Sequence, residues 1–145
     1  IVRADFENIS LPFKEGSFDV VFSKSVLEHF YYPEKIVKAI FRILKKKGLV
    51  LSMVPDWESV YKTFYVDYTH RTPFTLNSLE EIFLIHGFDE VQVEKFFQLP
   101  FLWNHPALKP FIRLLGMVLP QKLRQYSKFI RFSQEIMLLS SAVKA

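Results

Sequence analysis

The 145-residue chain contains no cysteine, which excludes disulfide bonds, thiolate metal sites and cysteine nucleophiles together. Long hydrophobic runs are also missing, because Pro, Lys or Arg interrupts each apolar stretch well before the ~20 residues that a membrane-spanning helix needs. Arg3, Asp5 and Glu7 lie where a signal peptide would have its apolar core. We therefore expect a cytoplasmic protein.

Metal-binding patterns and blocks of like charge are equally scarce. The chain has four histidines, and no two of them lie four residues apart around a carboxylate, as in helix-borne zinc sites: His29, His70, His86 and His105. This spacing predicts no metal site. The net charge of +4 is modest and the basic residues are dispersed, so the sequence does not indicate specific binding to nucleic acid.

What is present is an α/β pattern with enough apolar residues, 50%, to form a core. The apolar run Phe18–Phe22 predicts a strand covered on both faces. Helical spacing from Pro33 onward predicts a helix that carries Lys45–Lys47 at its end and stops at Gly48. Leu49–Val54 is a second apolar run. Strand, helix and strand in this order predict a right-handed βαβ unit in an open doubly wound sheet, with ligands beyond the carboxyl ends of the strands.

The rest of the chain is also interpreted as helices and strands joined by loops. An aromatic-rich loop, Asp56–Thr72, precedes a helix that Thr75 caps and Gly87 ends. Val91 and Val93 alternate with polar residues and predict a half-exposed strand. The remaining segments are interpreted as a linker, two helices and a last strand: Pro100–His105, Pro106–Leu119, Lys122–Phe132 and Glu135–Val143.

One block of sequence resembles the middle of class I S-adenosylmethionine-dependent methyltransferases. It consists of Leu11–Phe13, Ser17–Phe22, Val26–Phe30, Arg42–Lys45 and Gly48–Leu51. The resemblance covers about residues 1–98. It implies a three-layer, Rossmann-like doubly wound sheet with strand order 3-2-1-4-5-7-6, mostly parallel with an antiparallel last strand. We expect one incomplete domain, with residues 99–132 as a helical insert or lid and residues 133–145 as the final strand.

The resemblance also implies where the cofactor would bind. The family's glycine-rich cofactor loop lies upstream of this block, so we expect the chain to be the downstream part of an enzyme and to bind S-adenosylmethionine poorly by itself. Asp5 would accept a hydrogen bond from the adenine amino group and Phe6 would cover the ring. The methionine portion would lie near Ser23, Lys24, Ser25 and His29. The ordinary alternative is that Asp5 caps a turn and that the serine hydroxyls are satisfied locally.

The stretch from Tyr68 to Thr75 is similar to a Thr-His-Arg element that borders the acceptor in this family. The resemblance makes His70 and Tyr68 the catalytic candidates, with His70 as a general base near neutral pH. Arg71 would hold an acceptor carboxylate or phosphate, and Trp57 and Tyr65 would contact the acceptor. A structural role remains open, in which His70 and Arg71 fix this loop to the edge of the sheet.

These expectations predict methyl transfer to a small or medium acceptor at O, N or C. The alternative is a non-catalytic methyltransferase-like interaction module. The insert is basic and amphipathic, which predicts a lid that shapes an apolar acceptor pocket, with peripheral membrane contact as an extension. The strand Phe18–Phe22 would be an exposed edge in this chain, through which we expect it to self-associate.

Overall fold

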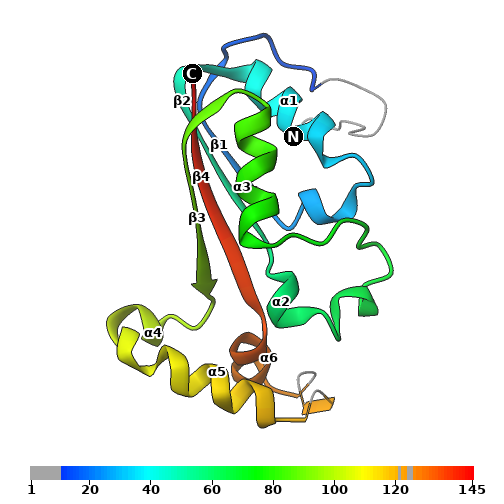
Figure 1. The fold of residues 1–145 in the computed structure, drawn as a ribbon, viewed down its shortest axis with the longest axis vertical. Helices are drawn as coiled ribbons and strands as arrows, with labels where there is room; N and C mark the ends of the chain where they lie inside the picture. Colours follow the sequence, from blue (N-terminus) through cyan, green and yellow to red (C-terminus); the bar gives the residue numbers. More distant parts are fainter. Residues whose placement is uncertain (1–10, 121, 124–125) are drawn as a thin grey trace.

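The structure is a computed structural model that describes residues 11–120, 122–123 and 126–145 (Figure 1). Its strands are β1 (Phe18–Lys24), β2 (Leu44–Pro55), β3 (Phe88–Phe97) and β4 (Ile136–Lys144). Its α-helices are α1 (Pro33–Ile43), α2 (Trp57–Val60), α3 (Leu76–Ile85), α4 (Phe101–Asn104), α5 (Lys109–Val118) and α6 (Lys128–Gln134). Three short 3-10 helices are η1 (Leu27–His29), η2 (Phe64–Val66) and η3 (Pro106–Leu108).

The four strands form one sheet in the order β1-β2-β4-β3. β1 and β2 are parallel, as expected of the βαβ unit, and β4 is antiparallel to both β2 and β3. β1, β2 and β3 therefore run in the same direction. This arrangement corresponds to the 4-5-7-6 portion of the expected strand order, and it confirms the predicted α/β fold with an antiparallel last strand.

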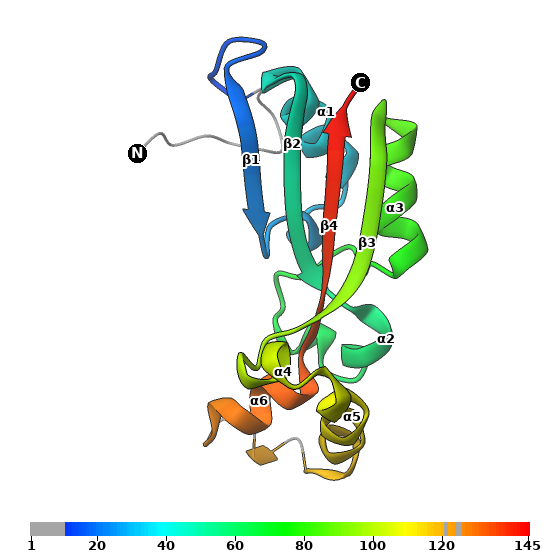
Figure 2. The same ribbon diagram turned by 90° about the vertical axis from the view of Figure 1, so that its left-hand side faces the viewer.

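Helices α1 and α3 lie on the same face of the sheet (Figures 1 and 2). They bury an apolar core against it that includes Ile40, Val54, Phe83 and Leu138. On β1, Val21 packs against this core, whereas Val20 and Phe22 are 53% and 60% exposed. The prediction that this strand is covered on both faces is therefore wrong for the described residues. Among them, helices α1 and α3 pack on the same face of the sheet and leave the other face of β1 exposed.

The junction between α1 and β2 also differs from the prediction. The helix ends at Ile43, and Lys45–Lys47 belong to β2 instead of the last helical turn. Lys47 has a left-handed backbone (φ 62°), and the pairing with β1 shifts register here, from Leu44 opposite Phe18 to Leu49 opposite Val20. A Cβ atom at Gly48 would lie 2.8 Å from the carbonyl oxygen of Lys45. Gly48 thus permits a close backbone approach inside a bulged strand and does not end a helix.

The other predicted helix boundaries agree better with the structure. Thr75 and Ser78 form a reciprocal capping box at the start of α3, and Gly87 follows its end with φ +87°. The expected linker before residue 106 contains the short helix α4, and Pro110 falls in the first turn of α5, where its missing N–H is tolerated.

The insert packs at one end of the sheet. Helices α4, α5 and α6 lie beyond the carboxyl ends of β1, β2 and β3 instead of covering a face (Figure 2). They have a small core of their own, formed by Leu99, Leu102 and Ile112. None of the helices in the described ranges has the length and apolar character needed to cross a bilayer.

Candidate functional site

A cavity of about 850 Å³ lies where β1 and β2 end. Its polar lining includes Lys24, Ser25, Glu28, His29, Asp67 and His70, and its apolar lining includes Pro55, Val60, Phe64, Phe132, Ile136 and Met137. These residues come from the carboxyl ends of β1 and β2, from η1 and α2, from the loop that follows α2, from helix α6 and from the start of β4. Ligands of open α/β sheets bind at this edge, and the volume is typical of small-molecule sites.

Backbone hydrogen bonds join η1 to the loop that follows β2. The amides of Arg71 and Thr72 donate to the carbonyl oxygen of Glu28 at 2.7 and 3.1 Å, and the Thr72 hydroxyl donates to the carbonyl oxygen of Phe30 at 2.7 Å. This pairing brings two distant parts of the chain together. The imidazole rings of His29 and His70 consequently lie with their centroids 4.8 Å apart.

His70 is held in one tautomer. Its Nδ1 lies 2.7 Å from the carbonyl oxygen of Phe64, and a carbonyl can only accept, so Nδ1 carries the proton and Nε2 of the neutral ring keeps its lone pair. The ring also packs on the buried Phe64 side chain, with centroids 4.5 Å apart. Nε2 lies 3.9 Å from Oδ2 of Asp67.

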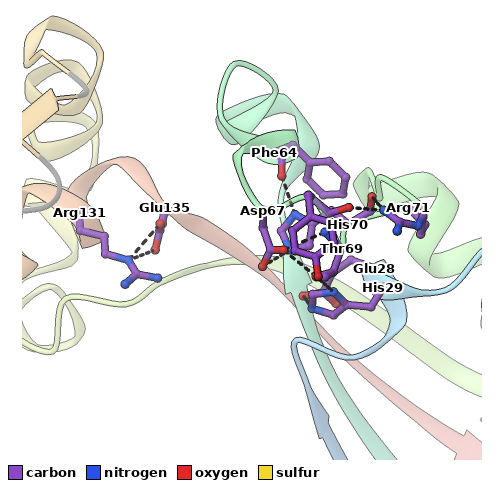
Figure 3. Close-up of polar contacts among 10 residues, drawn as sticks. Glu28, His29, Phe64, Asp67, Thr69, His70, Arg71, Arg131 and Glu135 are labelled. Atoms are coloured by element: carbon purple, nitrogen blue, oxygen red, sulfur yellow. Dashed lines mark hydrogen bonds and ion pairs between the residues drawn. The ribbon is translucent and has the colours of Figure 1, made fainter. Parts of the chain in front are cut away.

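The tautomer of His29 is fixed through Thr69 (Figure 3). The Thr69 hydroxyl donates to Oδ1 of Asp67 at 2.6 Å, so it accepts the hydrogen of His29 Nδ1, which is 2.8 Å away. Nε2 of His29 therefore also has a lone pair, and it lies 3.9 Å from Oε1 of Glu28. The hydrogen bonds from Thr69 lower the pKa of Asp67, which stays ionised.

Glu28 is fully buried, and neither of its carboxylate oxygens has a hydrogen-bond partner among the described residues. Burial raises the pKa of this carboxyl group to about 7. A buried carboxylate without partners costs several kcal/mol unless it is protonated or paired. Glu28 is therefore a buried polar group at this cavity whose two carboxylate oxygens accept no hydrogen bond from a described residue.

The predicted cofactor residues are distributed unevenly. Asp5 and Phe6 lie outside the described residues. Lys24, Ser25 and His29 line the cavity, whereas Ser23 is buried in β1 with no hydrogen-bond partner for its hydroxyl among the described residues. Ser25 has a left-handed backbone (φ 52°), and its amide donates to the carbonyl oxygen of Met53 at 2.9 Å, which turns the chain sharply at the end of β1.

Of the predicted catalytic and acceptor-binding residues, His70 alone lines the cavity. Tyr68 is 81% exposed. The Arg71 guanidinium donates to the carbonyl oxygens of Tyr68 and His70 and lies 5.3 Å from the ring centroid of Tyr31. These contacts support the structural alternative for Arg71. Trp57 and Tyr65 pack edge-on in an aromatic cluster, with centroids 6.2 Å apart.

Three residues of the site were not predicted from the sequence as functional residues: Glu28, Asp67 and Thr69. A signal for Glu28 is present, because it is a single acidic residue inside the otherwise apolar and aromatic stretch Val26–Tyr32. Asp67 and Thr69 belong to a loop without periodicity, and their roles depend on contacts that the loop makes with η1.

The parallel strands, the antiparallel last strand and the cavity at the strand ends define the fold of class I S-adenosylmethionine-dependent methyltransferases, so the resemblance seen in the sequence is confirmed. Residues 1–52 match the family described as methyltransferase domain. An uncharacterized protein of Methanocaldococcus jannaschii is 33% identical over 98 residues, which are 66% of this chain and 41% of that protein. The chain thus spans about two-fifths of the length of this relative.

Two solved structures illustrate the shared fold. A protein described as a putative methyltransferase, in complex with the Haloferax volcanii methyltransferase activator Trm112, is 22% identical with a TM-score of 0.65, and the match covers 97% of this chain and 58% of that one. Phosphoethanolamine N-methyltransferase 2 of Haemonchus contortus, in complex with S-adenosyl-L-methionine, is 22% identical with a TM-score of 0.60. That match covers 91% of this chain and 34% of the other.

Proposed function

We propose that the protein containing this chain transfers a methyl group from S-adenosylmethionine to a small or medium acceptor. The observation that carries the proposal is the cavity at the carboxyl ends of β1 and β2, in which two histidines of fixed tautomer converge, in a fold shared with methyltransferases. When bound, S-adenosylmethionine would supply an electrophilic methyl group. Transfer of that group depends chiefly on proximity and orientation.

The residues present fit the methionine end of such a cofactor. Lys24 and Ser25 bring an ammonium group and a hydroxyl to the cavity rim, and these groups suit a carboxylate and an ammonium respectively. The unsatisfied hydroxyl of Ser23 lies next to them in the chain. We assign these three residues and His29 to the methionine portion, and Asp5 and Phe6 to the adenine.

His70 is our candidate for the group that takes up a proton from the acceptor. The Phe64 carbonyl keeps Nε2 unprotonated in the neutral ring, and ionised Asp67, 3.9 Å away, would stabilise the imidazolium that forms. Tyr68 remains a second candidate on the same loop. The Arg71 side chain would contact an acceptor carboxylate or phosphate only after leaving its present carbonyl partners.

The lining supports an acceptor with an apolar part. Phe64 comes from the loop after β2, Phe132 from the insert and Met137 from β4, so three separate segments contribute apolar surface. Trp57 and Tyr65 pack edge-on against Phe64 and would support this wall. We assign residues 99–132 to acceptor selection on this basis.

Release of S-adenosylhomocysteine by the purified protein, measured over a panel of hydroxyl, amine and carbon acceptors that includes phosphoethanolamine, tests the reaction. His70→Gln should lower kcat by about 100-fold if the base is needed. The matched control is His86→Gln directly after α3, because the His86 ring also bonds a backbone carbonyl but lies outside the cavity lining. Absence of turnover with every acceptor would instead favour the interaction module.

The role of the insert has its own test. Phe132→Ala should raise the KM of an apolar acceptor and leave cofactor affinity unchanged, whereas Phe129→Ala should change neither, because Phe129 stacks on Phe101 outside the cavity lining. Equal effects of the two substitutions would contradict the proposal. Membrane contact is a separate extension, supported by the exposed apolar residues Phe111, Leu114 and Met117 of α5, and co-sedimentation with anionic vesicles tests it.

A further inference from the structure

Glu28, His29 and His70 bring together three side chains of the types that bind metal ions. One ligand atom of each, a carboxylate oxygen or an imidazole nitrogen, lies within 4.8 Å of the others. The group combines two neutral donors with one anionic donor. Imidazole and carboxylate ligands in this ratio suit first-row transition metals such as zinc or iron, whereas magnesium prefers oxygen ligands alone.

The hydrogen bonds around the two histidines have the pattern found around metal-ligating histidines. In such sites the other ring nitrogen donates to a carbonyl, a carboxylate or a comparable acceptor, which orients the ring and fixes the tautomer. His70 donates from Nδ1 to the Phe64 carbonyl, and His29 donates from Nδ1 to Thr69, which in turn donates to Asp67. Both Nε2 atoms therefore offer a lone pair.

Glu28 provides the independent observation that something binds at this point. Its side chain is fully buried beside the two imidazoles, and both oxygens lack a hydrogen-bond partner among the described residues. Buried charges in proteins are paired or coordinate metals. No cationic side chain of the described residues forms an ion pair with Glu28 apart from His29, at 3.9 Å.

We propose that Glu28, His29 and His70 form a binding site for a divalent transition metal ion, with zinc as the reference ligand. With bonds of ~2.0–2.2 Å, two ligands of one tetrahedral zinc ion lie roughly 3.4 Å apart. The 3.9 Å between Nε2 of His29 and Oε1 of Glu28 needs only a small side-chain adjustment to reach that separation. All three residues line the cavity, so the remaining coordination positions would be accessible to water or to an acceptor oxygen.

This site differs from the expectation drawn from sequence spacing, which predicted no metal. It also changes the roles of His70 and His29, because an imidazole bound to a metal through Nε2 neither accepts a proton nor contacts the methionine portion of the cofactor with that nitrogen. The metal would then orient an acceptor oxygen, and the histidines would hold the ion. Metal binding itself does not depend on methyl transfer, so the two proposals can fail separately.

The test is titration of the untagged, chelator-treated 145-residue chain with zinc chloride by calorimetry and with cobalt chloride by visible absorption. We expect one zinc per chain, a cobalt spectrum with the visible bands of a four- or five-coordinate ion, and weaker binding of magnesium. His29→Ala, His70→Ala and Glu28→Gln should each weaken zinc binding at least tenfold. Circular dichroism in the presence of chelator establishes that each variant is folded.

Two matched variants distinguish this site from adventitious binding. His86→Ala and His105→Ala remove histidines outside the group and should leave zinc affinity unchanged. Thr69→Val keeps all three ligands but removes the acceptor for His29, and it should weaken binding by about 10- to 100-fold. Zinc binding that is absent, or that falls as much in the control variants as in the ligand variants, would overturn the proposal.

Discussion

The hydroxyl of Thr69 accepts a hydrogen bond from Nδ1 of His29 at 2.8 Å, although the two residues lie on opposite sides of β2 in the chain. This contact joins the first half of the βαβ unit to the loop after its second strand. The same hydroxyl donates to Oδ1 of Asp67, so His29, Thr69 and Asp67 form one chain of hydrogen bonds.

Replacing Thr69 with valine should release His29 without changing the size of the side chain. We expect the His29 ring to change from one Nδ1-protonated tautomer to a mixture of tautomers. The nitrogen chemical shifts of the ring, measured by NMR in the presence of chelator, report this change. The free energy of unfolding should fall by about 1 kcal/mol, the net value of a typical hydrogen bond. Thr63→Val is the control, because the Thr63 hydroxyl donates to the carbonyl oxygen of Val60 and not to a histidine. Unchanged ring shifts in Thr69→Val would refute the assigned tautomer.

Glu28 should make the stability of the metal-free protein depend on pH. Burial raises the pKa of the Glu28 carboxyl group from 4.5 to about 7 in the folded state. The free energy of unfolding is therefore highest below about pH 4.5, and this contribution of Glu28 is lost as pH rises through 7. Glu28→Gln removes this loss. At pH 8 in chelator the variant should be more stable than the wild type, by roughly 3 kcal/mol for a shift of this size, and the difference should vanish near pH 4. Denaturant titrations at both pH values measure it, and a variant that is less stable at pH 8 would show that the carboxylate has a partner.

The exposed edge of β1 should cause self-association of the 145-residue chain. Among the described residues β1 pairs only with β2, and Val20 and Phe22 are more than half exposed. Phe22→Lys should reduce association in analytical ultracentrifugation, because a charge on an edge strand opposes pairing with a second strand. Ile85→Lys on α3 changes another exposed apolar residue, away from this edge, and should have no effect. A wild-type chain that stays monomeric would contradict this prediction.

Cofactor affinity of the same chain should be low, since the glycine-rich loop that the resemblance implies does not occur in its sequence. We expect calorimetry with S-adenosylhomocysteine to show weak or undetectable binding by the 145-residue chain. A methyltransferase of known affinity for S-adenosylhomocysteine is the positive control. Low-micromolar binding by the 145-residue chain would mean that the residues at the end of β1 suffice, or that the resemblance has been aligned wrongly.

Much of the sheet could be predicted from the sequence, because apolar runs and helical spacing report burial directly. The βαβ unit, the cap at Thr75 and a strand at Val91 and Val93, which the structure extends to Phe88–Phe97, follow from such patterns. The junction near Gly48 could not be predicted in this way. A run of lysines followed by glycine is typical of a helix end, and only the pairing partner of β2 reveals that the same residues form a bulged strand.

The candidate site was predictable only in part. His29 and His70 were identified separately, each from its neighbours in the sequence. Their proximity depends on the amides of Arg71 and Thr72, which pair with Glu28 across a loop that has no periodicity. Glu28 itself belongs to a stretch that reads as apolar. The burial of a charged residue is a property of the tertiary structure, which no local pattern of residue types specifies.

The position of β4 has a consequence for how the chain folds during synthesis. β4 lies between β2 and β3, and these two strands do not pair with each other. The sheet therefore cannot close until Ile136–Lys144 has left the ribosome, although β3 already ends at Phe97. In the interval β2 and β3 each present an unpaired edge, so a pause in translation within the α4–α6 segment would prolong the stage at which nascent chains are most prone to aggregate.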